Sequence, residues 1–184
     1  MMKRILFTVI LISMFNFKTA TNANYEQTFF DFSIKSNTGE IINLNQYKNN
    51  VILIVNTASY CGFTKQYSDM QKLWDKYKKD GLVVIGVPSN SFNQEKDEDS
   101  EVKEFCEVNF SINFPITTIT KVTGDDAHEI YKWARENHGK SAIPKWNFHK
   151  ILINKYGKIE ETYSSITKPT SKKITSKIES LLEN

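Results

Sequence analysis

Hydrophobic and polar positions along the chain follow two different periods, which predict alternating strands and helices. Two continuous apolar runs rich in β-branched residues, 51–55 and 82–87, are typical of strands that are covered on both faces of a sheet. Between them, apolar side chains recur at spacings of three and four, as on one face of an amphipathic helix. These side chains are Tyr67, Met70, Leu73, Trp74 and Tyr77. A strand, a helix and a second strand in this order predict a crossover between parallel strands.

Shorter strands are predicted on both sides of this unit. Apolar residues alternate with polar ones over 30–34, turn-forming residues cover 36–39, and two isoleucines follow, which together predict a β-hairpin. Near the C-terminus, 149–153 and 158–163 flank a turn that contains glycine, and they predict an antiparallel pair. Sheet-forming segments therefore occur near both ends of the chain as well as in the middle.

Three further helices are predicted from apolar spacing and capping residues. Val102, Phe105 and Cys106 share one face of the first helix, and Asp126 is placed to cap the second. The second helix carries Ile130, Tyr131 and Ala134, and the last carries Ile174, Ile178, Leu181 and Leu182. The complete order predicts one α/β domain, with a mixed central sheet flanked by helices and an N-terminal β-hairpin.

The first residues differ in character from the rest of the chain. Lys3 and Arg4 precede an apolar run over 5–17, and a stretch of small residues follows up to Ala23. This order is typical of a secretory signal peptide, and the run is shorter than the roughly 20 apolar residues that span a bilayer. We expect residues 1–23 to be a signal peptide, residues 24–184 to form a single domain without a stable membrane anchor, and the protein to be exported, to the periplasm or as a secreted protein.

Charge and histidine content exclude two classes of function. The whole chain has 24 basic and 21 acidic residues, and residues 1–23 contain three of the basic ones, so the remaining domain is about neutral and a nucleic-acid partner is not expected. The histidines, His128, His138 and His149, fall in different predicted elements without acidic or cysteine partners at metal-ligand spacing. We therefore interpret them as structural or surface residues and expect no metal and no cofactor.

Two cysteines, Cys61 and Cys106, are candidates for redox chemistry. Two are too few for a disulfide framework, so they form one structural bridge, two unrelated thiols or a redox couple. Cys61 lies between a predicted central strand and the helix that follows, where the helix N-terminus favours a thiolate. A thiolate cleaves the O–O bond of a hydroperoxide and becomes a sulfenic acid.

Three segments along the chain carry a family resemblance. Segment 56–64 reads Asn-Thr-Ala-Ser-Tyr-Cys-Gly-Phe-Thr, segment 87–95 reads Val-Pro-Ser-Asn-Ser-Phe-Asn-Gln-Glu, and segment 145–148 reads Lys-Trp-Asn-Phe. In this order they resemble the active-site segments of the glutathione peroxidase family, in its cysteine-containing branch. The first has Thr57 where the family usually has Val, and the second has one residue fewer before Gln94. The resemblance implies a thioredoxin-like fold, with which the predicted elements are compatible, and a thiol peroxidase acting on hydrogen peroxide and on organic or lipid hydroperoxides.

The resemblance also assigns roles to individual residues. It places Gln94, Trp146 and Asn147 around Cys61, where an amide and an indole N–H can donate to a thiolate or to the leaving oxygen without adding charge. It makes Cys106 the resolving cysteine, which would attack the Cys61 sulfenic acid to form a disulfide; the other interpretation of Cys106 is a buried core residue. The reductant implied is a thioredoxin-like dithiol, with glutathione as the other candidate.

Two other functions and one structural expectation remain from the sequence. A thioredoxin-like disulfide oxidoreductase would need a second cysteine close to Cys61, and segment 61–64 has only one. A non-catalytic exported binding module with a structural Cys61–Cys106 bridge would not need Gln94 or Trp146. The short segment 134–145 lacks the longer insertion of tetrameric relatives, so we expect a monomer.

Overall fold

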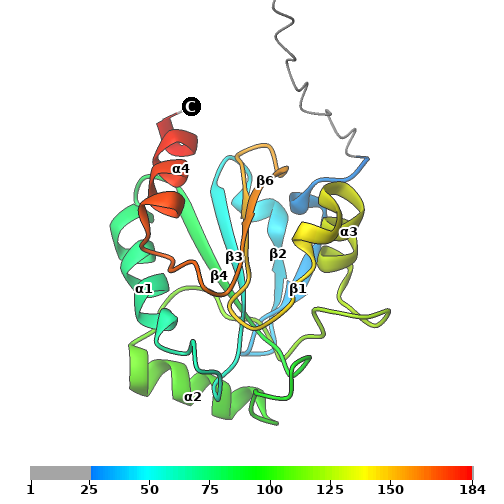
Figure 1. Cartoon of the computed structure of the whole chain (residues 1–184), viewed down its shortest axis with the longest axis vertical. Coiled ribbons are helices and arrows are strands. Elements are labelled where there is room, and N and C mark those ends of the chain that lie inside the picture. The colour runs from blue at the N-terminus through cyan, green and yellow to red at the C-terminus, as the bar shows by residue number, and fades with distance from the viewer. Residues whose placement is uncertain (1–25, 184) are drawn as a thin grey trace, which may run out of the picture.

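The computed structural model describes residues 26–183, and Figure 1 shows the arrangement of their elements. The helices are α1 (Gln66–Tyr77), α2 (Asp99–Phe110), α3 (Glu129–His138) and α4 (Lys172–Glu183). The strands are β1 (Ser33–Lys35), β2 (Ile41–Asn43), β3 (Val51–Thr57), β4 (Leu82–Pro88), β5 (Lys150–Ile153) and β6 (Ile159–Tyr163). The expected signal peptide, 1–23, lies outside the described residues.

Four strands form the central sheet in the order β4-β3-β5-β6. β3 pairs in parallel with β4 and antiparallel with β5, and β5 pairs antiparallel with β6. Every residue of β3 and β4 is buried, because both faces of these strands are covered, as their continuous apolar runs predict. β1 and β2 pair separately as an antiparallel hairpin. The predicted mixed sheet and N-terminal hairpin are therefore confirmed.

Helices cover both faces of the sheet. In Figure 1, α1 and α4 lie on one side of the strands, α3 lies on the other, and α2 crosses below α1. Alternate residues of β3 point to the two faces: Val51, Leu53 and Val55 join the cluster that contains α1, α2 and α4, whereas Ile52 and Ile54 join the cluster that contains α3. The domain thus has two apolar cores separated by the sheet, and both cysteines belong to the first.

Two details differ from the sequence-based expectation. The helix for which Asp126 was the predicted cap begins at Glu129, and its N-cap is His128, whose Nδ1 accepts the Ile130 N–H at 3.3 Å. An imidazole nitrogen here accepts the N–H that a carboxylate cap usually accepts. The assignment of the cap to Asp126 is therefore wrong. The first strand begins only at Ser33, because residues before it form a short 3₁₀ helix, Phe29–Asp31.

Within residues 26–183, no helix is long and apolar enough to cross a membrane.

Candidate active site

Cys61 lies in the turn between the central strand β3 and helix α1. The strand ends at Thr57 and the helix begins at Gln66, so the turn is held by local hydrogen bonds. The Thr64 hydroxyl donates to the Ala58 carbonyl at 3.1 Å and also to the Cys61 carbonyl, and the Thr64 N–H donates to the Cys61 carbonyl at 3.0 Å. Thr64, the last residue of the first motif, therefore bonds to carbonyls at two places in the turn. These bonds hold the backbone on both sides of the thiol in place.

The Cys61 sulfur is almost fully buried and accepts one backbone N–H of the turn that leads into α1. Its side chain is 5% exposed, and Sγ accepts the Phe63 N–H at 3.5 Å. Phe63 precedes Gln66, the first residue of α1, by three positions, so this donor belongs to the turn and not to the helix. The position predicted for Cys61 from the strand–helix order is therefore the one that the structure has.

Gln94 reaches the Cys61 turn through its backbone. The Tyr60 N–H donates to the Gln94 carbonyl at 2.9 Å, so the residue before Cys61 is attached to the second motif. This is possible despite the shortened loop because Asn93 adopts a left-handed conformation, with a φ of 56°. Asparagine tolerates this region better than most residues.

Asn147 and Trp146 complete the group of predicted side chains. Asn147 Nδ2 donates to Gln94 Oε1 at 3.1 Å, and the Trp146 ring packs on Phe92 with centroids 5.4 Å apart. Asn147 is fully buried, whereas Trp146 is 42% exposed. Three segments far apart in sequence thus meet beside the turn, although within the described residues no hydrogen bond joins these side chains to the Cys61 sulfur. Such contacts often form only when substrate is bound.

Asn56, near the end of β3, is a positioning residue to which the sequence analysis gave no role. Its Nδ2 donates to the Trp146 carbonyl at 3.2 Å, and its Oδ1 accepts the His149 N–H at 3.1 Å. Between these contacts Phe148 has a φ of 63°, a conformation that a bulky residue rarely adopts. Its N–H donates to the Asn56 carbonyl at 2.6 Å, and its ring packs edge-on against Tyr67. Asn56 therefore holds the third motif in place.

Glu95 is a second residue that the sequence analysis left without a role. Its carboxylate is 6% exposed, and Oε1 accepts the N–H of Ser59 at 3.0 Å and that of Lys96 at 2.9 Å. Burial raises the pKa of Glu95, while contacts with Ser59 and the Lys96 N–H act in the opposite direction. The only feature of the sequence that points to a role for Glu95 is its place directly after Gln94 in the second motif.

Cys106 lies in the middle of α2 and is fully buried in the same apolar cluster as Cys61. Both cysteines are free. Burial raises the pKa of the Cys106 thiol to about 12; the Tyr67 hydroxyl lowers it, and the charges of Glu95 and Glu107 raise it further. In this state Cys106 is a protonated thiol in the protein core, so the structure agrees with the core interpretation for the reduced protein.

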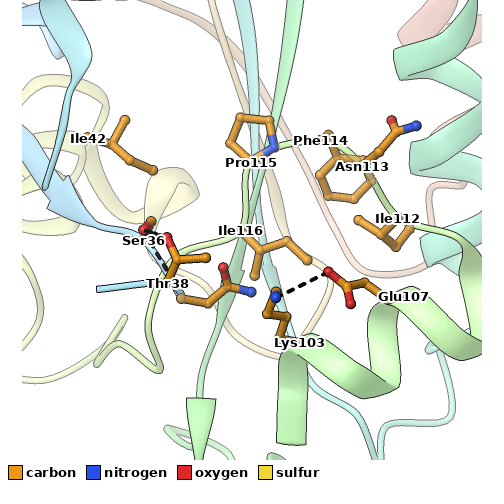
Figure 2. A pocket seen from close by; sticks show the side chains of 11 residues that line it. Ser36, Thr38, Ile42, Lys103, Glu107, Ile112, Asn113, Phe114, Pro115 and Ile116 are labelled. Atoms are coloured by element: carbon orange, nitrogen blue, oxygen red, sulfur yellow. Dashed lines mark hydrogen bonds and ion pairs between the residues drawn. The ribbon is translucent and has the colours of Figure 1, made fainter. Parts of the chain in front are cut away.

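Two hollows differ in their relation to this site: a small one of about 170 Å³ is lined by Trp146 and His149, and a larger one lies elsewhere. The larger hollow is a groove of about 360 Å³ between the β1–β2 turn and α2, where Lys103 and Glu107 form an ion pair at 3.7 Å. Figure 2 draws the side chains that line it. None of the four predicted site residues lines it. His149 is nearly buried, and burial, with the charges of Lys150 and Lys145, lowers its pKa to about 4. The described residues contain no cluster of three metal-ligating side chains.

The chain matches known proteins over most of its length. The family model described as "Glutathione peroxidase" matches residues 29–135. "Glutathione peroxidase-like peroxiredoxin 2" of Saccharomyces cerevisiae is 39% identical over 160 residues, which are 84% of this chain and 97% of the yeast protein. "Hydroperoxy fatty acid reductase gpx1" of Synechocystis is 37% identical over 169 residues, 87% of this chain and 99% of that protein.

Solved structures give the same result for the fold. The structure titled "Crystal structure of Trgpx in apo form" superimposes with a TM-score of 0.69 at 36% identity, covering 87% of this chain and 98% of the other. A putative thiol:disulfide interchange protein DsbE from Chlorobium tepidum, 18% identical, has a TM-score of 0.60 over 84% of this chain and 95% of the other. The latter likeness concerns the fold alone, which is thioredoxin-like as expected. The matched residues and the relatives that span nearly the whole domain show that this chain belongs to the glutathione peroxidase family.

Proposed function

We propose that the protein is a thiol peroxidase that reduces hydrogen peroxide and organic hydroperoxides through Cys61. The observation that carries this proposal is the meeting of the three motifs at the Cys61 turn, by way of Gln94 and Asn147. The Cys61 thiolate attacks one oxygen of the peroxide and the O–O bond breaks. The sulfur is oxidised to a sulfenic acid, and the other oxygen takes a proton and leaves as water or an alcohol.

The neighbouring side chains assist this step by donating hydrogen bonds. Gln94 Oε1 is occupied by Asn147, which leaves the Gln94 NH₂ group available as a donor. Trp146 is the exposed member of the group, so its side chain meets the solvent from which the peroxide arrives. Neutral donors of this kind stabilise charge on the sulfur and on the leaving oxygen without trapping either as an ion pair.

Cys106 completes the cycle as the resolving cysteine in this proposal. Its thiol attacks the sulfenic sulfur of Cys61, which releases water and leaves a disulfide. In the reduced state this thiol is buried and its pKa is raised to about 12, so it is a poor nucleophile in its place in α2. The helix must open or move first, and the oxidised site is the state in which it does so.

The reductant is a thiol compound, and we assign a thioredoxin-like dithiol to this role in preference to glutathione. A dithiol reduces the Cys61–Cys106 disulfide by two successive exchanges and is itself left oxidised. The yeast relative, which is named a peroxiredoxin, fits this preference. We further propose an exported monomer, on the strength of the pattern over 1–23 and the short segment 134–145.

The deciding experiment is stopped-flow peroxide consumption by the reduced protein. Wild type is expected to consume one equivalent rapidly, and Cys61→Ser is expected to lose this reaction while Cys106→Ser keeps it. Equal rates for wild type and Cys61→Ser would refute the peroxidase and would leave the binding module as the better interpretation. Turnover with a thioredoxin system and with glutathione, in parallel, then identifies the reductant; faster turnover with glutathione would overturn the dithiol assignment.

A further inference from the structure

The turn that carries Cys61 is attached to the Gln94–Glu95 segment at two successive residues. The Ser59 N–H donates to Glu95 Oε1 at 3.0 Å, and the Tyr60 N–H donates to the Gln94 carbonyl at 2.9 Å. The first of these bonds ends on a buried side chain, so it depends on the residue type at position 95, whereas the second ends on the backbone. Glu95 is therefore the side chain that decides whether this attachment is complete.

Further hydrogen bonds hold the backbone and Oε1 of Glu95, whereas Oε2 is buried without a hydrogen-bond partner. Its N–H donates to Asn90 Oδ1 at 3.3 Å, and its Oε1 also accepts the Lys96 N–H at 2.9 Å. The neighbouring Lys96 reaches back over the turn, where its Nζ donates to the Tyr60 hydroxyl at 3.2 Å. The segment thus holds the Cys61 turn through a buried carboxylate, a backbone carbonyl and a surface contact.

A carboxylate at a buried position has a free-energy cost that an apolar side chain does not have. Burying a charge is unfavourable unless hydrogen bonds compensate it, and an apolar side chain would fill the same space without that penalty. What the side chain adds is an oxygen acceptor inside the protein, which an apolar side chain cannot supply. This oxygen accepts the N–H of Ser59, which lies two residues before Cys61.

The place of Glu95 in the chain gives this bond a second consequence. Helix α2, which carries Cys106, begins at Asp99, four residues after Glu95. If α2 opens to bring Cys106 to the oxidised sulfur, the chain before it must not carry the Cys61 turn along. In that case Glu95, which precedes α2, would lie between the helix that moves and the turn that stays.

We propose that Glu95 is a positioning residue, which holds the Cys61 turn in its reactive geometry through the Ser59 N–H and anchors the turn while α2 rearranges. The inference rests on the proposed function of Cys61 as the thiol that reacts with peroxide. It adds to that function a residue that does not touch the substrate and acts through the backbone of the turn.

The test compares three variants with the wild type. Glu95→Gln retains an oxygen that accepts the same N–H, whereas Glu95→Ala removes it. Glu98→Ala is the matched control, because Glu98 is an exposed acid of the same segment whose side chain makes no cap hydrogen bond. The first readout is the rate constant of Cys61 oxidation by hydrogen peroxide, measured where circular dichroism shows all proteins to be folded. The second is hydrogen exchange of the Ser59 amide.

The expected results separate positioning from general stability. Glu95→Ala should lose about tenfold to a hundredfold in the oxidation rate constant, as for a small misplacement of a reacting group, and its Ser59 amide should exchange faster. Glu95→Gln should stay within about threefold of wild type, and Glu98→Ala should match it. If Glu95→Ala does not fold, Glu95→Asp, which keeps the charge but shortens the reach, is expected to show the same loss.

Two outcomes would overturn the inference: Glu95→Ala oxidising at the wild-type rate with unchanged Ser59 exchange, or Glu95→Gln losing as much rate as Glu95→Ala. In the first case the proposed peroxidase stands without the anchor. If the wild type does not react with peroxide, but the Ser59 amide loses protection in Glu95→Ala alone, the proposed function fails and the anchoring role of Glu95 in the turn is supported.

Discussion

Asn147 Nδ2 donates a hydrogen bond of 3.1 Å to Gln94 Oε1, across 53 residues of sequence. The bond joins the second and third motifs directly. It also fixes the orientation of the Gln94 amide, because the oxygen is used and the NH₂ group is turned toward other partners. Each residue therefore depends on the other for its place beside the Cys61 turn, and their effects on the reaction with peroxide are expected to be coupled.

The first prediction concerns this coupling. Gln94→Ala and Asn147→Ala are each expected to lower the rate constant of Cys61 oxidation by about tenfold or more, since each removes a donor or the residue that orients it. The double variant should lose clearly less than the product of the two single losses, because either substitution already breaks the pair. Stopped-flow measurements on the four proteins check this, and multiplicative losses would show that the two residues act independently.

The second prediction concerns Cys106. After one equivalent of peroxide, intact-mass analysis of wild type should show a loss of about two hydrogens, from disulfide formation, whereas Cys106→Ser should gain one oxygen at Cys61. The oxidation rate of Cys61 should stay within about twofold in this variant, because Cys106 is protonated and buried before oxidation. A wild-type protein that keeps the added oxygen would leave Cys106 as a core residue.

The sheet and the position of the thiol could be predicted from the sequence because both depend on local patterns. The continuous apolar runs of β3 and β4 have few other interpretations, and a cysteine directly after the first run falls at the carboxyl end of the sheet. The motifs then marked Gln94, Trp146 and Asn147, and the structure brings their segments together. The sheet and the place of Cys61 needed only patterns along the chain, whereas the roles of Gln94, Trp146 and Asn147 were implied by the resemblance to the family.

The two positioning residues could not be predicted in the same way. Asn56 acts on residues 90 and more positions away, and Glu95 on one 36 positions away, so their roles follow only from the folded arrangement. Both stand inside the matched motifs, but a motif does not say which of its members hold others in place. The N-cap was misassigned for a related reason: a histidine at position 128 is a less usual cap than the aspartate two residues before it.

The third prediction separates the role of Asn56 from its effect on stability. Asn56→Ala removes one hydrogen bond to the third motif and one to His149, directly after it, and should lower the free energy of unfolding by about 1–3 kcal/mol. It should also change the fluorescence of Trp146 and slow the reaction with peroxide. The fluorescence is best read in a background where the other two tryptophans are replaced by phenylalanine.

Asn50→Ala is the matched control for this experiment. Asn50 stands just before the other end of β3, where its Nδ2 donates to the Gly81 carbonyl at 3.1 Å. Its loss should lower stability without altering Trp146 fluorescence or peroxide reactivity. If both variants behaved alike, Asn56 would be a residue of general stability and not one that positions the third motif.

The last prediction is a pH dependence of stability that arises at His149. This side chain is 8% exposed, and burial, followed by the charges of Lys150 and Lys145, lowers its pKa from 6.5 to about 4. In the unfolded chain the imidazole takes up a proton near its ordinary pKa of 6.5. Between these two values the unfolded state binds more protons, so the free energy of unfolding falls as the pH falls.

The contribution of His149 is therefore fully present above pH 6.5 and is lost as the pH approaches 4. A shift of this size corresponds to about 3 kcal/mol. Urea unfolding of wild type and of His149→Gln at a series of pH values between 7 and 4 measures it, because the variant retains every other acid group and only the imidazole is removed. The wild type should lose about 3 kcal/mol more than the variant across this range. Parallel pH profiles would mean that His149 titrates at its ordinary pKa, with water reaching the ring, and that the imidazole is not buried as the structure places it.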